Sequence, residues 1–362
     1  MFILLLFLLE IKSYNFLSQF FHKFDYSFIA NNKNNINESF INKEEIKNNF
    51  QDNIINNNIS IEQNLNKLNP NWITGFCDGE ASFTISISSS TTNNNWIIRP
   101  SFSIHLHKKD IKILELIQFY FNGIGNINIS KDSVIYRVRK LEDLLIINSH
   151  FINYPLQTSK FNNFYIFYKV INLMLKNHHL NNEGLLEIAS LINKLNKPLS
   201  PLILSKIGIL PLIELNLPSI NKEPELDPWW ITGFCDGESS FTYFKRKRIT
   251  AKKEERLDFS PIFEVSQHKK DLYILNSILN FFKSGNIVSG GNTERSTPRV
   301  RITGIDNLKN RVIEHFSNYP LQSFKVFNYN VWVDIINTIS LDSTWSKERE
   351  NNLLALTEKL NK

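Results

Sequence analysis

Two glutamates at the ends of matching segments are the strongest candidates for chemistry in this chain of 362 residues. Glu80 ends the segment LNPNWITGFCDGE, and Glu238 ends the segment LDPWWITGFCDGE. A carboxylate in the last turn of a helix opposes the helix dipole, so its presence in both copies needs a reason. Two carboxylates held close together repel unless a cation or a shared proton lies between them. Oxygen ligands of this kind suit Mg²⁺, and we expect the pair to bind a divalent cation.

Glycines in the same segments predict that two helices pack side by side. Gly75 and Gly79 are four residues apart and therefore lie on one helical face. A glycine inside a helix costs about 1 kcal/mol relative to alanine, and close approach of another backbone is the usual reason for it. Gly233 and Gly237 repeat the spacing, so we expect the two glycine faces to contact each other. This contact would bring the two glutamates together at one end of the pair.

Each of these helices has a start signal. Asn69 and Asp227 are good N-cap residues, and a proline follows each of them. The first helix is therefore expected over residues 71–80. Trp72 and Trp230 come directly after these starts and are expected to pack in the core.

Strands and further helices follow each segment in one common order. Alternation predicts strands over 82–88, 99–107, 123–130 and 134–139 in the first copy, and over 241–248, 257–267, 285–287 and 298–302 in the second. Helical spacing predicts helices over 110–121, 141–153, 161–176 and 182–195, and over 272–282, 307–316, 324–339 and 344–360. The motifs HKKD, GNI and NYPLQ also occur twice, in the same order. Each unit is thus α-β-β-α-β-β-α with antiparallel sheets that are apolar on one face.

Composition divides the chain further. We expect an N-terminal extension over 1–65 that is partly disordered, a first unit over 66–196, a proline-rich linker over 197–227 and a second unit over 228–362. The extension is either without importance, a remnant of an upstream reading frame, or a processed leader. Its apolar run over 2–9 is too short to span a bilayer, so we expect no stable membrane insertion.

The overall composition narrows the class of protein. Hydrophobic residues make up 42%, and the net charge of +6 with a pI near 9.0 suits a polyanionic partner. Cys77 and Cys235 are too few for a disulfide framework and are expected to be buried thiols. The abundance of residues with AT-rich codons, such as Asn, Ile and Lys, points to an AT-rich genome such as a fungal mitochondrial one.

The paired segments resemble the signature helices of the LAGLIDADG homing endonucleases. ITGFCDGE at 73–80 and at 231–238 carries the resemblance, and the HKKD, GNI and NYPLQ repeats extend it over roughly residues 66–360. The chain is most similar to the single-chain, two-repeat members that fungal mitochondrial introns encode. The resemblance implies an α+β fold of two pseudo-twofold-related αββαββα units, whose antiparallel sheets form a saddle over duplex DNA.

The resemblance also implies an activity. It implies a monomeric, mitochondrial, site-specific endonuclease that cuts both strands of double-stranded DNA with Mg²⁺ or another divalent cation. Glu80 and Glu238 would be catalytic and would bind the metal, assisted by the backbone carbonyls of Gly79 and Gly237.

One departure from the family pattern keeps an alternative open. Members often carry a lysine just after the GNI-type turn of the third strand, whereas Asn128 and Val288 stand here. Relatives that have lost cleavage act as maturases, which help the host intron RNA to splice. A DNA-binding regulator built on a decayed nuclease is a third hypothesis, which the two intact acids disfavour.

Candidate DNA contacts lie on the polar faces of the expected sheets and beyond the NYPLQ motifs. Residues two apart on a strand share a face, as Arg137 and Arg139 do. Positive side chains would contact phosphates, and polar ones would read base edges. The full set is Ser86, Ser88, Arg99, Arg137, Arg139, Lys160, Lys245, Arg246, Lys247, Arg248, Gln267, Arg299, Arg301 and Lys325. Lys160 and Lys325 follow NYPLQ at equal distances and are expected near the DNA backbone or between the two units.

Overall fold

The structure is a computed structural model that describes residues 68–89, 96–195, 198–214, 223–249, 253, 255–289, 297–341 and 346–360. Residues 66–362 belong to one compact unit, which is separate from residues 1–65. The extension predicted over 1–65 lies outside the described residues. Within the described ranges, none of the helices is both long and apolar enough to cross a membrane.

The first repeat forms one four-stranded antiparallel sheet in the order β1-β2-β4-β3. Its elements are α3 (Pro70–Glu80), β1 (Ala81–Ser89), β2 (Trp96–His107), η1 (Lys108–Asp110), α4 (Ile111–Tyr120), β3 (Asn126–Ser130), β4 (Ser133–Val138), α5 (Leu141–Asn153) and α6 (Lys160–Leu175). The η2 turn (His178–Leu180), α7 (Asn182–Ile192) and α8 (Pro201–Ile207) follow.

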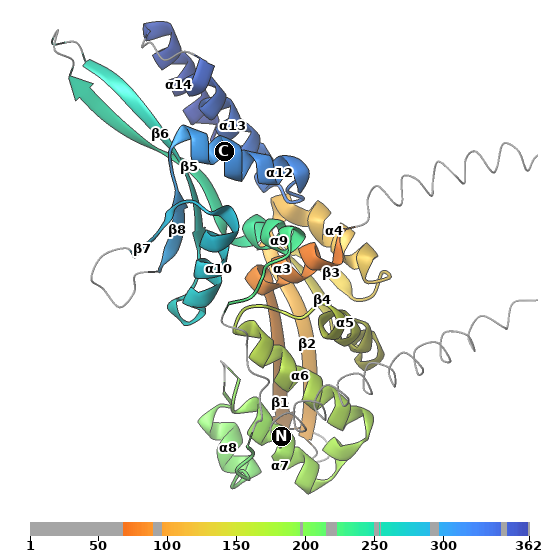
Figure 1. Ribbon diagram of the computed structural model, residues 1–362. Coiled ribbons are helices and arrows are strands. Elements are labelled where there is room, and N and C mark those ends of the chain that lie inside the picture. The colour runs from red at the N-terminus through yellow and green to blue at the C-terminus, as the bar shows by residue number, and fades with distance from the viewer. Residues whose placement is uncertain are drawn as a thin grey trace, which may run out of the picture. The chain divides into compact units, whose positions relative to one another are not determined.

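The second repeat has the same sheet order, β5-β6-β8-β7 (Figure 1). Its elements are α9 (Pro228–Glu238), β5 (Ser239–Ile249), β6 (Glu255–Ser266), η3 (Lys269–Asp271), α10 (Leu272–Phe282), β7 (Asn286–Val288), β8 (Arg299–Ile302), α11 (Ile305–Asn307), the π-helical turn η4 (Leu308–Ile313), α12 (Glu314–Asn318), α13 (Lys325–Leu341) and α14 (Lys347–Lys359). The predicted α+β fold of two αββαββα repeats is confirmed.

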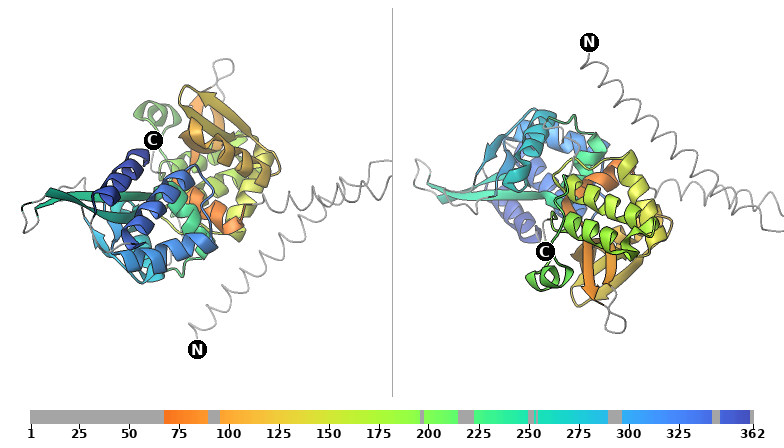
Figure 2. Two further views of the ribbon diagram at one scale, coloured as in Figure 1. Left: turned by 90° about the horizontal axis from the view of Figure 1, so that it is seen from above. Right: turned by 90° about the horizontal axis from the view of Figure 1, so that it is seen from below.

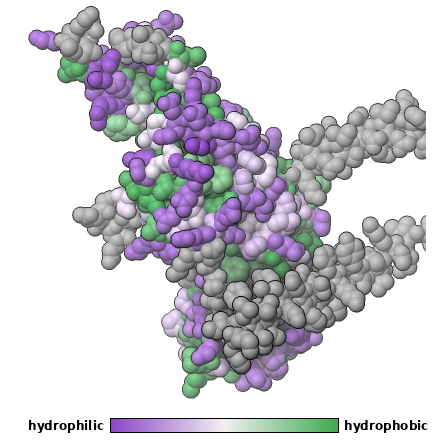
Figure 3. All heavy atoms as spheres, in the orientation of Figure 1, coloured by the Kyte–Doolittle hydropathy of each residue, from purple (hydrophilic) through white to green (hydrophobic). Residues whose placement is uncertain are grey.

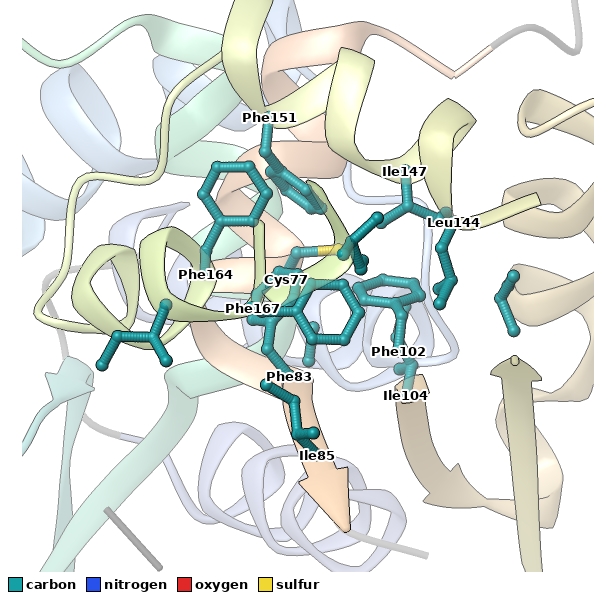
Figure 4. Close-up of a cluster of buried hydrophobic side chains, with 14 of the residues drawn as sticks. Cys77, Phe83, Ile85, Phe102, Ile104, Leu144, Ile147, Phe151, Phe164 and Phe167 are labelled. Atoms are coloured by element: carbon teal, nitrogen blue, oxygen red, sulfur yellow. The ribbon is translucent and has the colours of Figure 1, made fainter. Parts of the chain in front are cut away.

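Alternation along the strands builds the core of each repeat. In β1, buried residues alternate with exposed ones from Ala81 onward, so one face of the sheet is apolar. Helices α5 and α6 cover that face, and Phe83 and Phe102 meet Phe151 and Phe167 there (Figure 4). The opposite face stays polar and is free for another function.

Helices α3 and α9 lie side by side between the two repeats (Figure 1). The views from above and below also show α3 (orange) next to α9 (green) (Figure 2). A methyl group added at Gly75 would overlap the carbonyl oxygen of Trp230, and one added at Gly233 would overlap that of Trp72. The glycines therefore permit the backbone contact between the two helices.

The caps at the starts of these helices form as expected. Asn69 Oδ1 accepts a hydrogen bond from the Asn71 backbone N–H at 2.8 Å. Asp227 Oδ1 accepts one from the Trp229 N–H at 2.8 Å. Each cap also leaves a proline in the first turn, where its missing N–H costs nothing.

Two parts differ from the sequence-based expectation or extend it. The helix predicted over 307–316 is present over 305–318, and Leu308–Ile313 within it is π-helical. Strands β5 and β6 extend the predicted hairpin, and the face shown in Figure 3 has both hydrophilic and apolar side chains on it. The predicted unit and linker boundaries at 196 and 227 stay predictions, although α8 shows that the segment between them contains a helical turn.

Candidate active site and nucleic-acid interface

Glu80 and Glu238 end the two paired helices and lie next to each other. A methyl group added at Gly237 would lie 3.2 Å from Glu80 Oε1, and one added at Gly79 would lie 3.3 Å from Glu238 Cγ. Each acid thus crosses over the glycine of the opposite helix. The second glycine of each segment makes room for a carboxylate, whereas the first makes room for backbone.

The electrostatics of the two acids follow from their position. Burial raises the pKa of both carboxyl groups. For Glu238, the negative charge of Glu80 raises the pKa further, whereas the positive charges of Lys160 and Lys325 lower it. The fold therefore keeps two carboxylates close together although they repel each other and although burial removes part of their hydrating water.

Two partly buried lysines lie under the ends of the same helices. Lys160 Nζ donates hydrogen bonds to the carbonyl oxygens of Cys77 and Gly79 at 3.0 and 2.8 Å. Lys325 Nζ donates to those of Cys235 and Gly237 at 2.9 and 3.0 Å, and to that of Ser239 at 2.6 Å. A cation at a helix C-terminus complements the dipole. These lysines thus compensate for acids placed at the unfavourable helix end.

Burial lowers the pKa of both lysine side chains, although nearby carboxylates oppose this effect. For Lys160 the strongest opposing charge is that of Asp78, and for Lys325 it is that of Asp236. Both lysines were expected among the DNA contacts. The structure places their amines against carbonyl oxygens at the ends of the signature helices, beside the acid pair.

The structure offers cations beside the acids other than the lysines missing at Asn128 and Val288. Asn128 pairs with Ile135 on the edge strand β3, and Val288 pairs with Arg299 on the edge strand β7. The cations beside the acids come instead from the first residues of α6 and α13. A lysine near each acid is therefore present.

Asp78 and Asp236 are buried and connect the two repeats. Asp78 Oδ2 accepts a hydrogen bond from Trp230 Nε1, and Asp236 Oδ2 accepts one from Trp72 Nε1, both at 2.9 Å. Burial raises the pKa of both carboxyl groups, and the hydrogen bonds that they accept oppose this. The tryptophans pack in the core as expected, and they also donate hydrogen bonds across the helix pair.

The same two aspartates explain the repeated NYPLQ motif. Asp78 also accepts hydrogen bonds from the backbone N–H groups of Gln157 and Thr158 at 2.8 and 3.1 Å, and from the Thr158 hydroxyl at 2.6 Å. Asp236 binds Gln322 and Ser323 in the same way. Each motif is thereby held against a signature helix, directly before the lysine. Sequence analysis missed this role, although the identical Asp-Gly-Glu ends were its signal.

The donor set at the acids fits a hard divalent cation. Among the described residues, no group of three or more His, Cys, Asp or Glu side chains is placed to hold a metal ion. Mg²⁺ commonly binds through one or two carboxylates together with substrate phosphates and water, so two glutamates suffice. The carbonyls of Gly79 and Gly237, expected as further ligands, accept hydrogen bonds from the lysines here.

The polar face of the first sheet gathers many of the expected DNA contacts. Strand pairing along the hairpin brings Ser86 opposite Arg99, and Arg99 Nη1 donates to Ser88 Oγ at 2.7 Å. A hollow of about 410 Å³ on this face is lined by Ser82, Thr84, Ser86, Arg99, Ser101, Ser103, His105, Ile135, Arg137 and Arg139. The structure therefore brings the predicted strand contacts of the first repeat together, whereas Lys160 lies at the signature helix.

A second hollow links this face to the acid pair. It has a volume of about 720 Å³, and Glu80, Gly237 and Lys325 line it together with His105 and His107. Because His105 lines both hollows, the polar face of the first sheet continues to the acids.

The second sheet differs from the first in its charge balance. Arg301 Nε lies 2.6 Å from Glu264 Oε1, and Arg299 Nη1 lies 3.3 Å from Glu264 Oε2. Glu264 pairs with Ser240 in the sheet, whereas the matching pair of the first sheet is Ser103 with Ser82. Arg299 and Arg301 therefore share one internal carboxylate, whereas Arg137 faces a serine.

Strand alternation divides the basic run of β5 between two faces. Lys245 pairs with the buried Phe259, so Lys245 and Lys247 belong to the face that carries the core. Arg246 and Arg248 share the opposite, polar face. The four residues therefore do not share one face of the sheet, and their contact with DNA stays a prediction.

Gln267 lies just beyond the end of β6. Its side-chain oxygen accepts a hydrogen bond from the His268 backbone N–H at 2.7 Å. The predicted base contact by Gln267 therefore competes with a local turn.

The family model for LAGLIDADG endonucleases matches the chain twice, over residues 73–171 and 231–336. The chain belongs to the LAGLIDADG endonuclease family. Both matches include a signature helix, its sheet and the helix that supplies the partly buried lysine.

Solved LAGLIDADG structures share this arrangement. The homing endonuclease I-GzeII in complex with its DNA target is 30% identical, with a TM-score of 0.73 over 82% of this chain and 99% of that chain. I-SmaMI bound to uncleaved DNA with calcium ions is 28% identical, with a TM-score of 0.75 over 82% of this chain and all of that chain.

A curated relative comes from Neurospora crassa and carries the name probable intron-encoded endonuclease 3. It is 32% identical over 275 residues, which cover 74% of this chain and 50% of the relative. This chain thus spans about half the length of that relative.

Proposed function

We propose that this LAGLIDADG protein is a site-specific endonuclease that hydrolyses one phosphodiester bond in each strand of a DNA duplex. The observation that carries the proposal is the pair Glu80 and Glu238, held together at the ends of two helices in contact. Two nearly equivalent acids, one from each repeat, suit two cuts on opposite strands. The DNA-bound state of the related I-GzeII supports duplex DNA as the substrate.

The cofactor proposed for this reaction is Mg²⁺ or another divalent cation. Glu80 and Glu238 would hold it. Their pKa values are raised because burial makes ionisation of the carboxyl groups unfavourable, and a bound cation would offset this cost. A bound cation of this kind stabilises the charge that develops on the leaving oxygen of the phosphodiester. The calcium ions present with I-SmaMI and its uncleaved target support a divalent cation in this site.

The two lysines are proposed to have an orienting and an electrostatic role. Lys160 and Lys325 orient the carbonyls of Gly79 and Gly237 and place two positive charges beside the acids. Positive groups fixed near a phosphate stabilise negative charge without reorganising during the reaction. Because their pKa values are lowered toward neutral pH, the lysine amines also release a proton more readily than an exposed lysine does.

Binding of the duplex is proposed on the polar sheet faces. In the first repeat, Arg99, Arg137 and Arg139 line one hollow, where they would contact phosphates or guanine edges. In the second, Arg246, Arg248, Arg299 and Arg301 occupy the polar face. Both acids come from one chain, so a monomer is complete for cleavage.

We further propose that the protein spreads the intron that encodes it, in a mitochondrion. The name of the Neurospora relative and the abundance of residues with AT-rich codons support this origin. The alternative of a maturase that binds host intron RNA rested on the basic surface and on the lysines missing at Asn128 and Val288. Lys160 and Lys325 place cations beside the acids, which weakens the second of these reasons.

A cleavage assay tests the proposal. The purified protein should linearise a plasmid that carries the joined flanks of its own reading frame when Mg²⁺ is added, and should leave it intact in EDTA. Glu80→Gln should bind this DNA as tightly as the wild type but not cut it. Undiminished cutting by the double variant Glu80→Gln, Glu238→Gln would contradict the assignment. Cutting without any divalent cation would contradict the cofactor.

A further inference from the structure

The two HKKD motifs end in aspartates that cross the boundary between the repeats. Asp271 of the second repeat accepts hydrogen bonds from the backbone N–H and the hydroxyl of Ser159 in the first repeat, at 2.7 and 2.9 Å. Asp110 of the first repeat accepts one from the Phe324 N–H in the second, at 3.0 Å. Each aspartate therefore binds the chain of the other repeat.

The residues that they bind directly precede the active-site lysines. Ser159 comes just before Lys160, the first residue of α6, and Phe324 comes just before Lys325, the first residue of α13. The first N–H groups of a helix have no partner within the helix, and a carboxylate there also suits the dipole. Ser159 does not cap α6 with its own side chain, and its hydroxyl donates to Asp271 instead.

Each aspartate is itself fixed by its own repeat. His107 Nδ1 accepts a hydrogen bond from the Lys109 N–H, and His268 Nδ1 accepts one from the Lys270 N–H, both at 3.2 Å. These bonds hold the 3₁₀ turns that follow β2 and β6 and that end in the aspartates. The sheet of one repeat thereby sets the position of a helix start in the other.

We propose that Asp271 and Asp110 are positioning residues for the lysine of the opposite repeat, with Asp271 holding Lys160 and Asp110 holding Lys325. A shift at the start of α6 or α13 would move the amine that contacts the signature-helix carbonyls. An effect of these aspartates on catalysis rests on the proposed DNA cleavage. The dependence of each lysine's position on an aspartate of the other repeat does not rest on it.

The two contacts are unequal. Asp271 is 3% exposed and accepts two hydrogen bonds, and the neighbouring Tyr273 hydroxyl donates a further bond across the boundary to the Gln157 carbonyl at 2.9 Å. On the other side, Lys109 Nζ lies 5.2 Å from the centre of the Phe324 ring. Loss of Asp271 should therefore disturb Lys160 more than loss of Asp110 disturbs Lys325.

Acylation of individual lysines tests the crossed dependence in the DNA-free, full-length protein. An acetyl N-hydroxysuccinimide ester would be the probe, with the rate at each lysine followed by mass spectrometry. Asp271→Asn should accelerate labelling of Lys160 about tenfold and leave Lys325 within about twofold, as expected for loss of one set of charge-assisted hydrogen bonds. Asp110→Asn should accelerate Lys325 alone, by a smaller factor.

Two further variants keep the test decisive. Asp334→Asn makes the same chemical change at an exposed site on α13 and should alter neither lysine. If Asp271→Asn fails to fold, Ser159→Ala removes only the hydroxyl bond and should still accelerate Lys160 alone. Acceleration of the lysine in the same repeat, of both lysines equally, or of neither would overturn the proposal.

Cleavage kinetics separate this inference from the proposed function. Asp271→Asn should lower kcat for the joined-flank duplex several-fold while its Kd for that duplex stays unchanged, because the aspartate acts through Lys160. A wild-type protein that does not cut would contradict the endonuclease proposal and leave the crossed labelling pattern standing. A wild-type protein that cuts but shows no crossed pattern would contradict only the positioning role.

Discussion

Trp72 of the first repeat donates a hydrogen bond from its indole nitrogen to the buried carboxylate of Asp236 in the second, at 2.9 Å. Trp230 and Asp78 form the reciprocal bond at the same distance. Both acceptors also hold an NYPLQ motif, so these two bonds join the helix pair to the segments that carry the lysines.

Trp72→Phe should destabilise the protein because it keeps most of the ring volume but leaves a lone pair of the buried Asp236 unsatisfied. Loss of a hydrogen bond to a charged buried group costs about 1.5–3 kcal/mol. The free energy of unfolding from urea titration measures the change. Trp229→Phe, on the same turn of the opposite helix but without this bond, is the matched control, and an equal loss in both variants would contradict the role of the indole nitrogen.

Gly75→Ala and Gly79→Ala should separate stability from activity. The methyl group at residue 75 meets the rigid backbone of Trp230, so this variant should lose roughly 3 kcal/mol or more, or fail to fold. At residue 79 the methyl group meets the flexible side chain of Glu238, which can move aside. We expect Gly79→Ala to fold and to cut poorly.

Thermal unfolding and plasmid cleavage of the two variants give the comparison. A Gly79→Ala protein as unstable as Gly75→Ala would show that the acid cannot move and that residue 79 also sets the helix distance.

Glu80→Gln should raise stability at neutral pH. Burial raises the folded-state pKa of Glu80 above its ordinary value of 4.5, so ionisation is unfavourable in the folded state. The resulting penalty is absent well below pH 4.5 and develops as the pH rises through the folded-state pKa. We expect the variant to melt a few degrees higher than the wild type at pH 7 and equally at pH 4.

Calorimetry across this pH range without divalent cations measures the effect. The exposed Glu115→Gln serves as control and should follow the wild type at every pH. A difference that grows toward low pH would reverse the sign and contradict burial of the carboxylate as the cause.

Glu264→Gln should strengthen DNA binding and increase its salt dependence. The change frees Arg299 and Arg301 from an internal carboxylate, and each added phosphate contact steepens the plot of log K against log salt concentration by about 0.9. Ser103→Glu places a carboxylate at the matching site of the first sheet and should have the opposite effect. Parallel salt plots for all three proteins would contradict a DNA contact at these arginines.

Local signals made most of the fold predictable. The expected helices over 141–153 and 272–282 match α5 and α10 at both ends, and the Asn-Pro and Asp-Pro pairs mark the starts of α3 and α9. These features depend on caps, periodicity and prolines, all of which act within a few residues. The helix predicted over 307–316 is present, but its π-helical segment Leu308–Ile313 has no comparable signal in the sequence.

The site was less predictable because its contacts are distant in sequence. The acid pair and the facing glycines follow from the repeat, whereas the position of Lys160 depends on carbonyls about 80 residues earlier. The two faces of the basic run in β5 could have been separated by the alternation rule. The internal neutralisation of Arg301 could not, because Glu264 meets it only through strand pairing.

The crossed bonds between α3 and α9 have a consequence for synthesis of the chain. Trp72 and Asp236 are 164 residues apart, so a ribosome that adds about 5–20 residues per second leaves the first of them waiting for roughly 10–30 s. During that interval the glycine face of α3 has no partner, and Asp78 lacks the Trp230 indole. In a nascent first repeat, the glycine face of α3 is therefore exposed to neighbouring copies of the chain. Rapid docking of the chain's own second repeat therefore favours a monomer over a domain-swapped dimer.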